Sequence, residues 1–222
     1  MVVLKNSKTF NNLARAFVGE CQARTRYEFI EFGARQQGYK NMADIIDEIA
    51  YNEFNHSRMF YSFIQSADKE TIKNINIEAG YPFKEKWDLL ENLKFAAEAE
   101  DDEATKIYPE FARVAKEEGF EDVANLFLNV IEVEKQHKAV FIELYNQMRT
   151  GTLYKKGKPV TWKCADCGYA IVAKEAFEKC PVCQAKQGAV YLHVKAHTEP
   201  PIEEIKESMV KVAPKPKTQP RA

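Results

Sequence analysis

The chain has 222 residues, enough for one domain with a substantial core and a second, smaller one. Its 33 acidic and 32 basic residues nearly balance, so we expect neither nucleic acid nor a membrane surface as the main partner. No apolar run approaches the roughly 20 residues that a bilayer span requires. The first residues lack the apolar stretch of a secretory signal, which favours a cytoplasmic location.

Four segments carry apolar residues at the three- and four-residue spacing of an amphipathic helix. They cover residues 10–37, 42–66, 87–118 and 123–148. Gly38 lies at the short break between the first and second predicted helices, and Gly119 lies at the break between the third and fourth. The residues between the two pairs, 67–86, have no strong helical periodicity, and their number predicts a long crossover along a helical bundle.

In each predicted helix, Glu or His interrupts the apolar stripe near its middle. The interrupting residues are Glu20, Glu53, His56, Glu100, Glu103, Glu134 and His137. An unpaired buried carboxylate is very costly, so each of these is expected to be neutral, paired or bound to a metal. The alternative is that they lie on solvated surface faces, which is the usual situation for a single Glu-x-x-His pair. Their number and placement favour two metal ions inside the bundle.

Two Glu-x-x-His pairs occupy equivalent places in two halves of the chain. Glu53 and His56 form the first pair, and Glu134 and His137 form the second, 81 positions later (134 minus 53). On a helix, residues three positions apart point to roughly the same side, so each pair can hold one metal ion. The repeat therefore predicts two ions facing each other.

The repeat is out of phase at one place. Tyr27 corresponds to Tyr108 at the offset of 81, but Glu20 corresponds to Asp101 and not to Glu100. The second half therefore has one extra residue between Glu100 and Tyr108. Helices often absorb an added residue as a π-bulge, and such bulges cluster at functional sites. We predict a wide helical turn between Glu100 and Tyr108.

A second metal site is predicted near the C-terminus. Cys164, Cys167, Cys180 and Cys183 form two Cys-x-x-Cys pairs separated by twelve residues. In a reducing compartment this pattern favours a tetrahedral metal site over disulfides. A structural zinc ribbon is one interpretation. Fusion to a dimetal bundle favours iron, because iron can carry one electron and zinc cannot.

These patterns divide the chain into four parts. They are a bundle (1–149), a linker (150–161), a cysteine domain (162–194) and a C-terminal extension (195–222). The linker is predicted from its glycines and its proline. For the extension we expect a short helix or disorder, because it is rich in proline and charged residues.

Three further residues with reactive side chains are expected to bind no metal. Cys21 adjoins Glu20 and is interpreted as a buried small residue. His193 and His197 follow the last cysteine pair, and we expect surface positions or local hydrogen bonds for both.

Taken together, these features resemble the rubrerythrin family over residues 7–194. The matching stretches are Gly19-Glu20-Cys21-Gln22-Ala23-Arg24 with Tyr27, Glu53/His56, Glu100 and Glu103 with Tyr108-Pro109, Glu134/His137, and the two cysteine pairs with Gly168-Tyr169 and Pro181. The resemblance implies a mainly α, ferritin-like four-helix bundle with a long crossover and a non-haem di-iron site. It also implies a small β-rich, rubredoxin-like domain with an Fe(Cys)4 site. In the purified protein, zinc can take the place of iron in that site.

The same resemblance implies an activity. Members of the family are expected to reduce hydrogen peroxide to water as a defence against oxidative stress. Electrons would come from rubredoxin or an NAD(P)H-dependent reductase and pass through the Fe(Cys)4 centre. A head-to-tail homodimer or a higher homo-oligomer is also implied. The alternatives are a ferroxidase or iron-handling protein, and a structural protein that holds zinc in all its sites.

The resemblance further implies that all seven interrupting residues bind the two irons. Glu134 and His137 would hold the second iron. Glu53 would bridge or flank the pair together with a carboxylate from the third or fourth helix, either Glu100 or Glu134.

The resemblance implies four catalytic residues: Glu103, His56, Tyr27 and Tyr108. Glu20 and Glu103 would hold the first iron in its oxidised state, and on reduction that iron would move from Glu103 to His56. This is chemically reasonable because ferric iron prefers anionic oxygen, while ferrous iron tolerates imidazole. Tyr27 and Tyr108 would hydrogen-bond to ligating carboxylates and help to protonate departing oxygen. The alternative is that both are ordinary core tyrosines.

Overall fold

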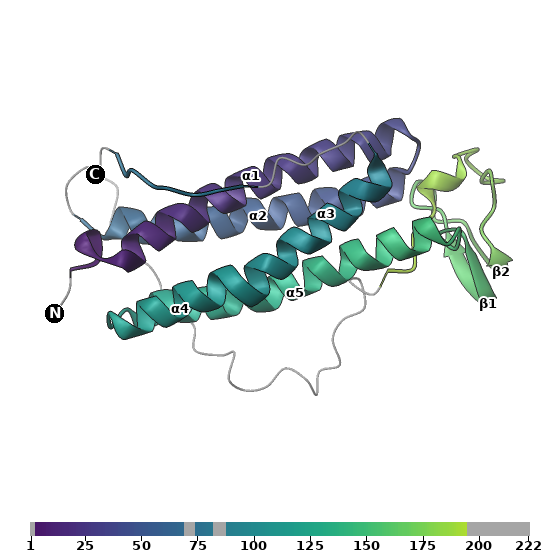
Figure 1. Ribbon diagram of the computed structural model, residues 1–222. Helices are drawn as coiled ribbons and strands as arrows, with labels where there is room; N and C mark the ends of the chain where they lie inside the picture. The colour runs from purple at the N-terminus through teal and green to yellow at the C-terminus, as the bar shows by residue number, and fades with distance from the viewer. Residues whose placement is uncertain (1–2, 69–73, 82–87, 195–222) are drawn as a thin grey trace.

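The computed structural model describes residues 3–68, 74–81 and 88–194. Within these residues, long helices form a bundle with a small β-containing module at one end (Figure 1). The helices are α1 (Lys8–Gln36), α2 (Lys40–Ser66), α3 (Leu89–Asp102), α4 (Tyr108–Glu117) and α5 (Glu121–Arg149). Because α3 and α4 continue into each other, the four predicted helices are confirmed close to their predicted ends.

Local sequence signals set the ends of these helices. The Ser7 side chain accepts a hydrogen bond from the Phe10 N–H and caps α1, and Asp88 caps α3 in the same way. Gly38 and Gly119 have positive φ angles of 86° and 85°, which allow the chain to reverse between paired helices. The breaks predicted at these two glycines are therefore confirmed.

A π-helix, Glu103–Ile107, connects α3 to α4. It lies between Glu100 and Tyr108, where the repeat has its extra residue. The wide turn predicted there is confirmed. Because the turn absorbs the extra residue, both Glu100 and Tyr108 remain buried in the bundle.

Two apolar clusters fill the bundle, one on each side of the acidic residues. Along α2, Met42 to Ala50 belong to the first cluster, and Phe60 and Ile64 belong to the second. Along α5 the order is reversed, with residues 123–131 in the second cluster and residues 140–144 in the first. The Glu-x-x-His pairs lie between the clusters, at mid-height in the bundle. Apolar packing on both sides thus fixes the helices that carry them.

The connection between α2 and α3 is a crossover, as predicted. Its described part, residues 74–81, is neither helix nor strand. Ile75 and Ile77 pack against the second cluster, and the Tyr81 hydroxyl donates to the Arg15 carbonyl of α1 at 3.2 Å. This segment therefore lies against the first hairpin, which completes a ferritin-like bundle.

The C-terminal module contains two antiparallel strands, β1 (Lys155–Lys163) and β2 (Ala170–Glu175), with Trp162 opposite Ile171. The buried Trp162 is the centre of a small core of its own. β1 begins inside the predicted linker, and Leu153 is buried against the bundle. The predicted linker at 150–161 thus includes the first residues of a strand. Its glycine and proline are compatible with a strand here, because both residues are tolerated where strand pairing is irregular, and the register of β1 shifts between Lys155 and Val160.

The module is docked closely on the end of the bundle. A Cβ atom at Gly188 would lie 1.7 Å from the Gly38 carbonyl oxygen, so only glycine allows the two backbones to approach in this way. The Leu192 N–H donates to the Asn41 side chain at 2.9 Å, and Lys40 lies 3.2 Å from Asp166. These contacts fix the module against the turn between α1 and α2.

Two predictions concern other parts of the chain. Within the described residues, none of the helices has the length and apolarity needed to cross a membrane. The predicted C-terminal extension, residues 195–222, lies outside the described residues.

Candidate metal centres

Carboxylates and imidazoles from α1, α2, α3 and α5 converge between the two apolar clusters. They form two overlapping groups, and within each group the candidate ligand atoms lie within 4.8 Å of one another. The first group is Glu20, Glu53, His56 and Glu134, and the second is Glu53, Glu100, Glu134 and His137. Glu53 and Glu134 belong to both groups, so they are placed to bridge two ions.

Each imidazole faces both shared carboxylates. His56 Nδ1 lies 2.9 Å from Glu53 Oε2 and 3.1 Å from Glu134 Oε1. His137 Nδ1 lies 2.9 Å from Glu53 Oε1 and 2.9 Å from Glu134 Oε2. The two ring centroids are 5.8 Å apart, and the ring planes are inclined by 28°. The two halves thus meet with approximate twofold symmetry, as the sequence repeat predicts.

The donor atoms fit a pair of divalent cations. Among the described residues, several buried atoms here make no hydrogen bond of suitable geometry, although some of them lie close to one another: Glu20 Oε2, Glu53 Oε1, Glu100 Oε2, both Oε atoms of Glu134, and His137 Nδ1. Buried polar atoms without partners are costly, and bound cations would satisfy them together. Carboxylate and imidazole are ligands that iron accepts, and the carboxylates also compensate the cation charge.

Burial and mutual repulsion shape the charges of the cluster. Burial raises the pKa of Glu20 and Glu103, and the neighbouring carboxylates raise it further. The same causes raise the pKa of Glu100 to about 8. Burial also acts to raise the pKa of Glu53, but the imidazoles of His137 and His56 hold it below its ordinary value. Without metal, protons therefore balance this cluster, and cations would displace them on binding.

Two buried tyrosines connect the halves crosswise. The Tyr27 hydroxyl of α1 donates to Glu100 of α3, and the Tyr108 hydroxyl of α4 donates to Glu20 of α1. Both rings are essentially inaccessible to solvent. Each tyrosine therefore orients the carboxylate that belongs to only one of the two groups.

One supporting residue was missed from the sequence. Asn52 Oδ1 lies 3.2 Å from His137 Nε2, which leaves Nδ1 of that ring to face the carboxylates. The corresponding residue in the second half is Val133, which offers no side-chain hydrogen bond. Among the described residues, His56 Nε2 has no equivalent partner. The repeat could have indicated this role, because Asn52 and Val133 differ although they occupy matching positions.

Glu103 is the predicted ligand that the structure leaves outside both groups. It is the first residue of the π-helix and is buried, with 7% of its surface exposed. Its Oε2 has no hydrogen-bond partner among the described residues. The structure thus brings six of the seven predicted ligands together, with Glu103 beside them and His56 inside the first group.

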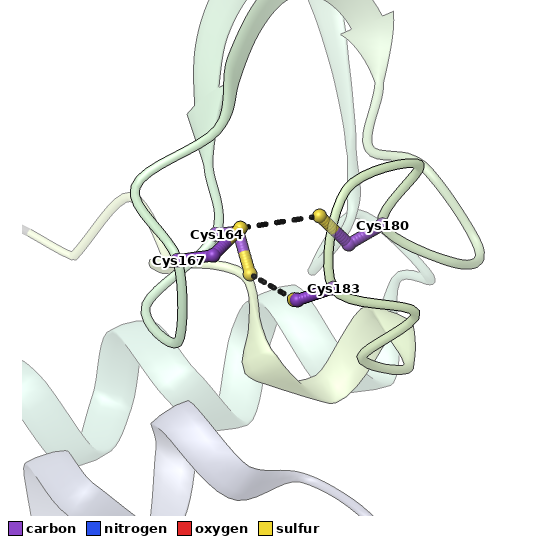
Figure 2. Close-up of side chains that lie close together, drawn as sticks. All are labelled: Cys164, Cys167, Cys180 and Cys183. Carbon is purple, nitrogen blue, oxygen red and sulfur yellow. Dashed lines mark hydrogen bonds between the residues drawn. The ribbon is translucent and has the colours of Figure 1, made fainter.

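The four cysteines form a second candidate centre in the C-terminal module. Figure 2 shows their side chains pointing toward one another from two loops. The Sγ atoms of Cys164 and Cys183 are 3.7 Å apart, and those of Cys167 and Cys180 are 3.5 Å apart. A tetrahedral site with metal–sulfur bonds of about 2.3 Å requires sulfurs about 3.8 Å apart, whereas a disulfide requires about 2 Å. The spacing fits a metal ion and excludes disulfides between these pairs.

The other candidate residues have local surroundings. Cys21 is only partly buried, contrary to the buried position predicted for it. It belongs to neither metal group, because it is one position beyond Glu20 on the helix and therefore points in another direction. His193 Nε2 lies 3.1 Å from the Thr161 carbonyl oxygen, and its ring packs edge-on against Trp162. The local role predicted for His193 is therefore confirmed, and His197 lies outside the described residues.

Comparison with known proteins agrees with both centres. The sequence model of the rubrerythrin family matches residues 11–145 and 91–164, and that of the rubrerythrin rubredoxin-like domain matches residues 162–189. Rubrerythrin of Clostridium perfringens is 43% identical over 82% of this chain and 93% of its own length. Rubrerythrin of Nitratidesulfovibrio vulgaris is 33% identical over 90% of this chain and 97% of its own.

A solved structure agrees as well. Nigerythrin in a mixed-valence state is 27% identical, with a TM-score of 0.55 over 87% of this chain and 92% of its own. The shared carboxylates, the π-helix and the four-cysteine module therefore have a common explanation. The chain belongs to the rubrerythrin family, with a di-iron carboxylate site in a ferritin-like bundle and a four-cysteine site in a rubredoxin-like domain.

Proposed function

We propose that this protein reduces hydrogen peroxide to water and receives electrons through its four-cysteine centre. The observation that carries the proposal is the presence of both centres in one chain, a buried Glu/His cluster and a tetrahedral thiolate site. A bundle that only stores or oxidises iron has no need of a second, one-electron centre. A protein with structural zinc alone has no need of a buried cluster with so many carboxylates.

The reaction requires two electrons and two protons for each peroxide molecule. Two ferrous ions bound by the Glu/His groups would supply one electron each. The protein's own contribution is to hold the carboxylates and to provide protons. Burial raises the pKa of Tyr27 and Tyr108 well above 10, so both hydroxyls keep their protons at neutral pH. Their hydrogen bonds to Glu100 and Glu20 place those protons at the edge of the cluster.

We further propose that Glu103 and His56 exchange as ligands when the centre changes oxidation state. Two features support this exchange. His56 lies in the first group while Glu103 lies just outside it. Among the described residues, His56 Nε2 also has no side-chain partner of the kind that Asn52 provides for His137, so we propose that its ring is freer to turn. The remaining predicted ligands, Glu20, Glu53, Glu100, Glu134 and His137, would stay in place.

The distance between the two centres bears on electron delivery. The cysteine module contacts the bundle near Lys40, and the helix from Lys40 to His56 rises about 24 Å. Rapid electron transfer over such a separation within one chain is not expected. We therefore propose a head-to-tail homodimer in which the partner's module lies beside the bundle cluster.

Mixed dimers test this arrangement. A Cys180→Ser chain lacks the thiolate centre, and a Glu134→Gln chain lacks a shared carboxylate. Each alone should be inactive with an electron donor, but their co-expression should restore part of the activity. A chain that carries both substitutions, mixed with either single variant, is the control. No recovery in the mixed sample would contradict the dimer.

The physiological donor is proposed to be rubredoxin or an NAD(P)H-dependent reductase, in the cytoplasm. The decisive experiment for the reaction is anaerobic reduction of the iron-loaded protein, followed by stoichiometric peroxide or by dioxygen. We expect reoxidation by peroxide to be much faster, observed through the absorbance of both iron centres. Faster reoxidation by dioxygen would favour a ferroxidase. A colourless protein with full zinc occupancy would contradict both.

A further inference from the structure

A cavity of about 200 Å³ lies between α1, the π-helix and the crossover. Exposed side chains of Arg15 and Asp102 line its outer part, and buried side chains of Glu103 and Tyr108 line its inner part. It therefore leads from the surface to the side of the cluster on which Glu103 lies. Sites for drug-sized ligands have at least about 300 Å³, so this volume suits a small molecule.

One face of α1 forms a wall of the cavity. Arg15, Gly19, Gln22 and Arg26 all line it, and their spacing of three or four residues places them on one side of the helix. Gly19 is in the middle of this face. A Cβ atom there would lie 3.9 Å from the Tyr81 ring and 4.0 Å from Glu103 Oε1. The missing side chain thus leaves open space between the crossover and Glu103.

This glycine has no role in shaping the helix. A glycine inside a helix costs about 1 kcal/mol relative to alanine, and α1 continues through Gly19 without a break. A Cβ atom at this position would meet its neighbours only at ordinary contact distances. Backbone conformation and close packing therefore do not require glycine here, whereas an open passage does.

Polar groups without partners point to a ligand in the cavity. Arg26 is 8% exposed, and its Nε and Nη2 have no hydrogen-bond partner among the described residues. Gln22 Oε1 and Glu103 Oε2 also lack partners there. Buried polar groups are normally satisfied, so these donors and acceptors suit a small ligand that both accepts and donates hydrogen bonds. Hydrogen peroxide has these properties.

Tyr81 covers part of the cavity. Its ring adjoins Gly19, and its hydroxyl is held by the Arg15 carbonyl at 3.2 Å. The residue belongs to the crossover and not to a helix. Its removal would widen the opening without changing any group of the metal cluster.

We propose that this cavity is the route by which hydrogen peroxide reaches the cluster. In this proposal Gly19 keeps the route open, Tyr81 narrows it, and Arg26 retains the peroxide beside Glu103. The inference rests on the proposed peroxidase function, but access itself can be measured independently with azide. Azide is a small molecule whose binding to the oxidised iron-loaded protein is followed by absorbance, without turnover.

The main test replaces Gly19 by a side chain that fills the passage. We expect Gly19→Leu to slow both azide binding and reoxidation by peroxide about tenfold, which corresponds to about 1.4 kcal/mol in activation free energy. Iron content and the final azide spectrum should stay unchanged. Gly33→Leu is the matched control, because Gly33 is in the same helix and a Cβ there meets nothing within 4 Å. Wild-type rates in Gly19→Leu with full iron would overturn the proposal.

A second variant, with the opposite expected effect on the rate of azide binding, keeps the proposal testable if Gly19→Leu does not fold. Tyr81→Ala should speed azide binding several-fold. If Gly19→Leu loses iron, an unchanged azide rate in Tyr81→Ala overturns the proposal by itself. The outcomes also separate the two hypotheses. Slow reoxidation of the wild-type protein by peroxide contradicts the peroxidase function, whereas fast reoxidation with rates insensitive to Gly19 and Tyr81 contradicts only the route.

Arg26 can be tested through steady-state kinetics. Arg26→Met keeps the apolar stem and removes the donors, so the KM for peroxide should rise several-fold with little change in kcat. Arg24→Met is the control, because Arg24 lies on another side of α1 and pairs with Glu28 at 2.8 Å. Equal KM values in the two variants would contradict the role of Arg26.

Discussion

The two halves of the bundle contribute nearly identical parts to one metal cluster, yet they differ in two places. Each half supplies a shared carboxylate, an imidazole and a tyrosine that reaches across to the other half. Within the part of the chain that the structure describes, however, only His137 is supported by an asparagine, and only the second half contains a π-helix, with Glu103 at its start. The common parts suffice to hold two ions. Asn52 supports the histidine of the second group, whereas Glu103 lies beside the first group, where we propose the ligand exchange.

Removing a shared carboxylate should have the largest effect, because it acts on both halves at once. Glu134 belongs to both groups, so Glu134→Gln would remove the one negative charge that both ions are proposed to share. We expect the loss of both bundle irons, measured as iron per chain. Glu132→Gln, an exposed residue on the same helix, should keep both. Full iron in Glu134→Gln would contradict the bridging role.

The two histidines should respond differently although they occupy equivalent positions. His137→Ala should lose one iron, because we propose that His137 stays a ligand in both oxidation states. His56→Ala should retain both irons in the oxidised protein and slow peroxide turnover by at least about tenfold. Iron analysis and turnover of the two variants provide the measurement. Identical behaviour of the two variants would show that the asymmetry has no mechanistic role.

Deleting Thr105 would make the second half resemble the first. Thr105 is exposed in the π-helix. Its removal would place Tyr108 seven positions after Glu100, the same spacing that separates Tyr27 from Glu20. We expect a regular α-helix, two bound irons and slower peroxide turnover, because Glu103 changes its direction relative to the cluster. A crystal structure and steady-state rates would check this. Normal turnover in a variant with a regular helix would contradict the role of the turn.

The smallest effect is expected from Asn52→Val, which gives His137 the same surroundings as His56. Loss of an outer hydrogen bond to a metal-bound histidine typically weakens metal binding about 10- to 100-fold. We expect a decrease at the lower end of this range, measured by competition with a chelator. Asn55→Val is the control, because the Asn55 side chain donates to the Tyr51 carbonyl of its own helix and belongs to neither metal group. Equal affinities in both variants would leave Asn52 without a role in binding.

The sequence predicted the helices and most of the cluster because both depend on spacing along the chain. A carboxylate in an apolar stripe shows where a helix faces the core, and the repeat offset located the π-helix at Glu103–Ile107. The sequence left open which carboxylate the two metal groups share in addition to Glu53, with Glu134 and Glu100 as the two candidates. That choice depends on how the hairpins meet, which spacing within one helix does not determine.

Features that depend on contacts between distant segments were not predicted. The hydrogen bond between Asn52 and His137 joins residues 85 positions apart. The cavity at Gly19 depends on the path of the crossover, which has no periodicity to read. The start of β1 inside residues 150–161 was also not predicted, because Gly and Pro mark turns more often than they mark an irregular strand.

The π-helix has a consequence for how such a site can change over time. A bundle assembled from two identical hairpins would carry every substitution and insertion twice, so its two metal positions would have to remain alike. In this chain the hairpins are joined, and each can vary alone. The single extra residue between Glu100 and Tyr108 is a change of this kind, available only to a duplicated sequence whose copies are free to diverge.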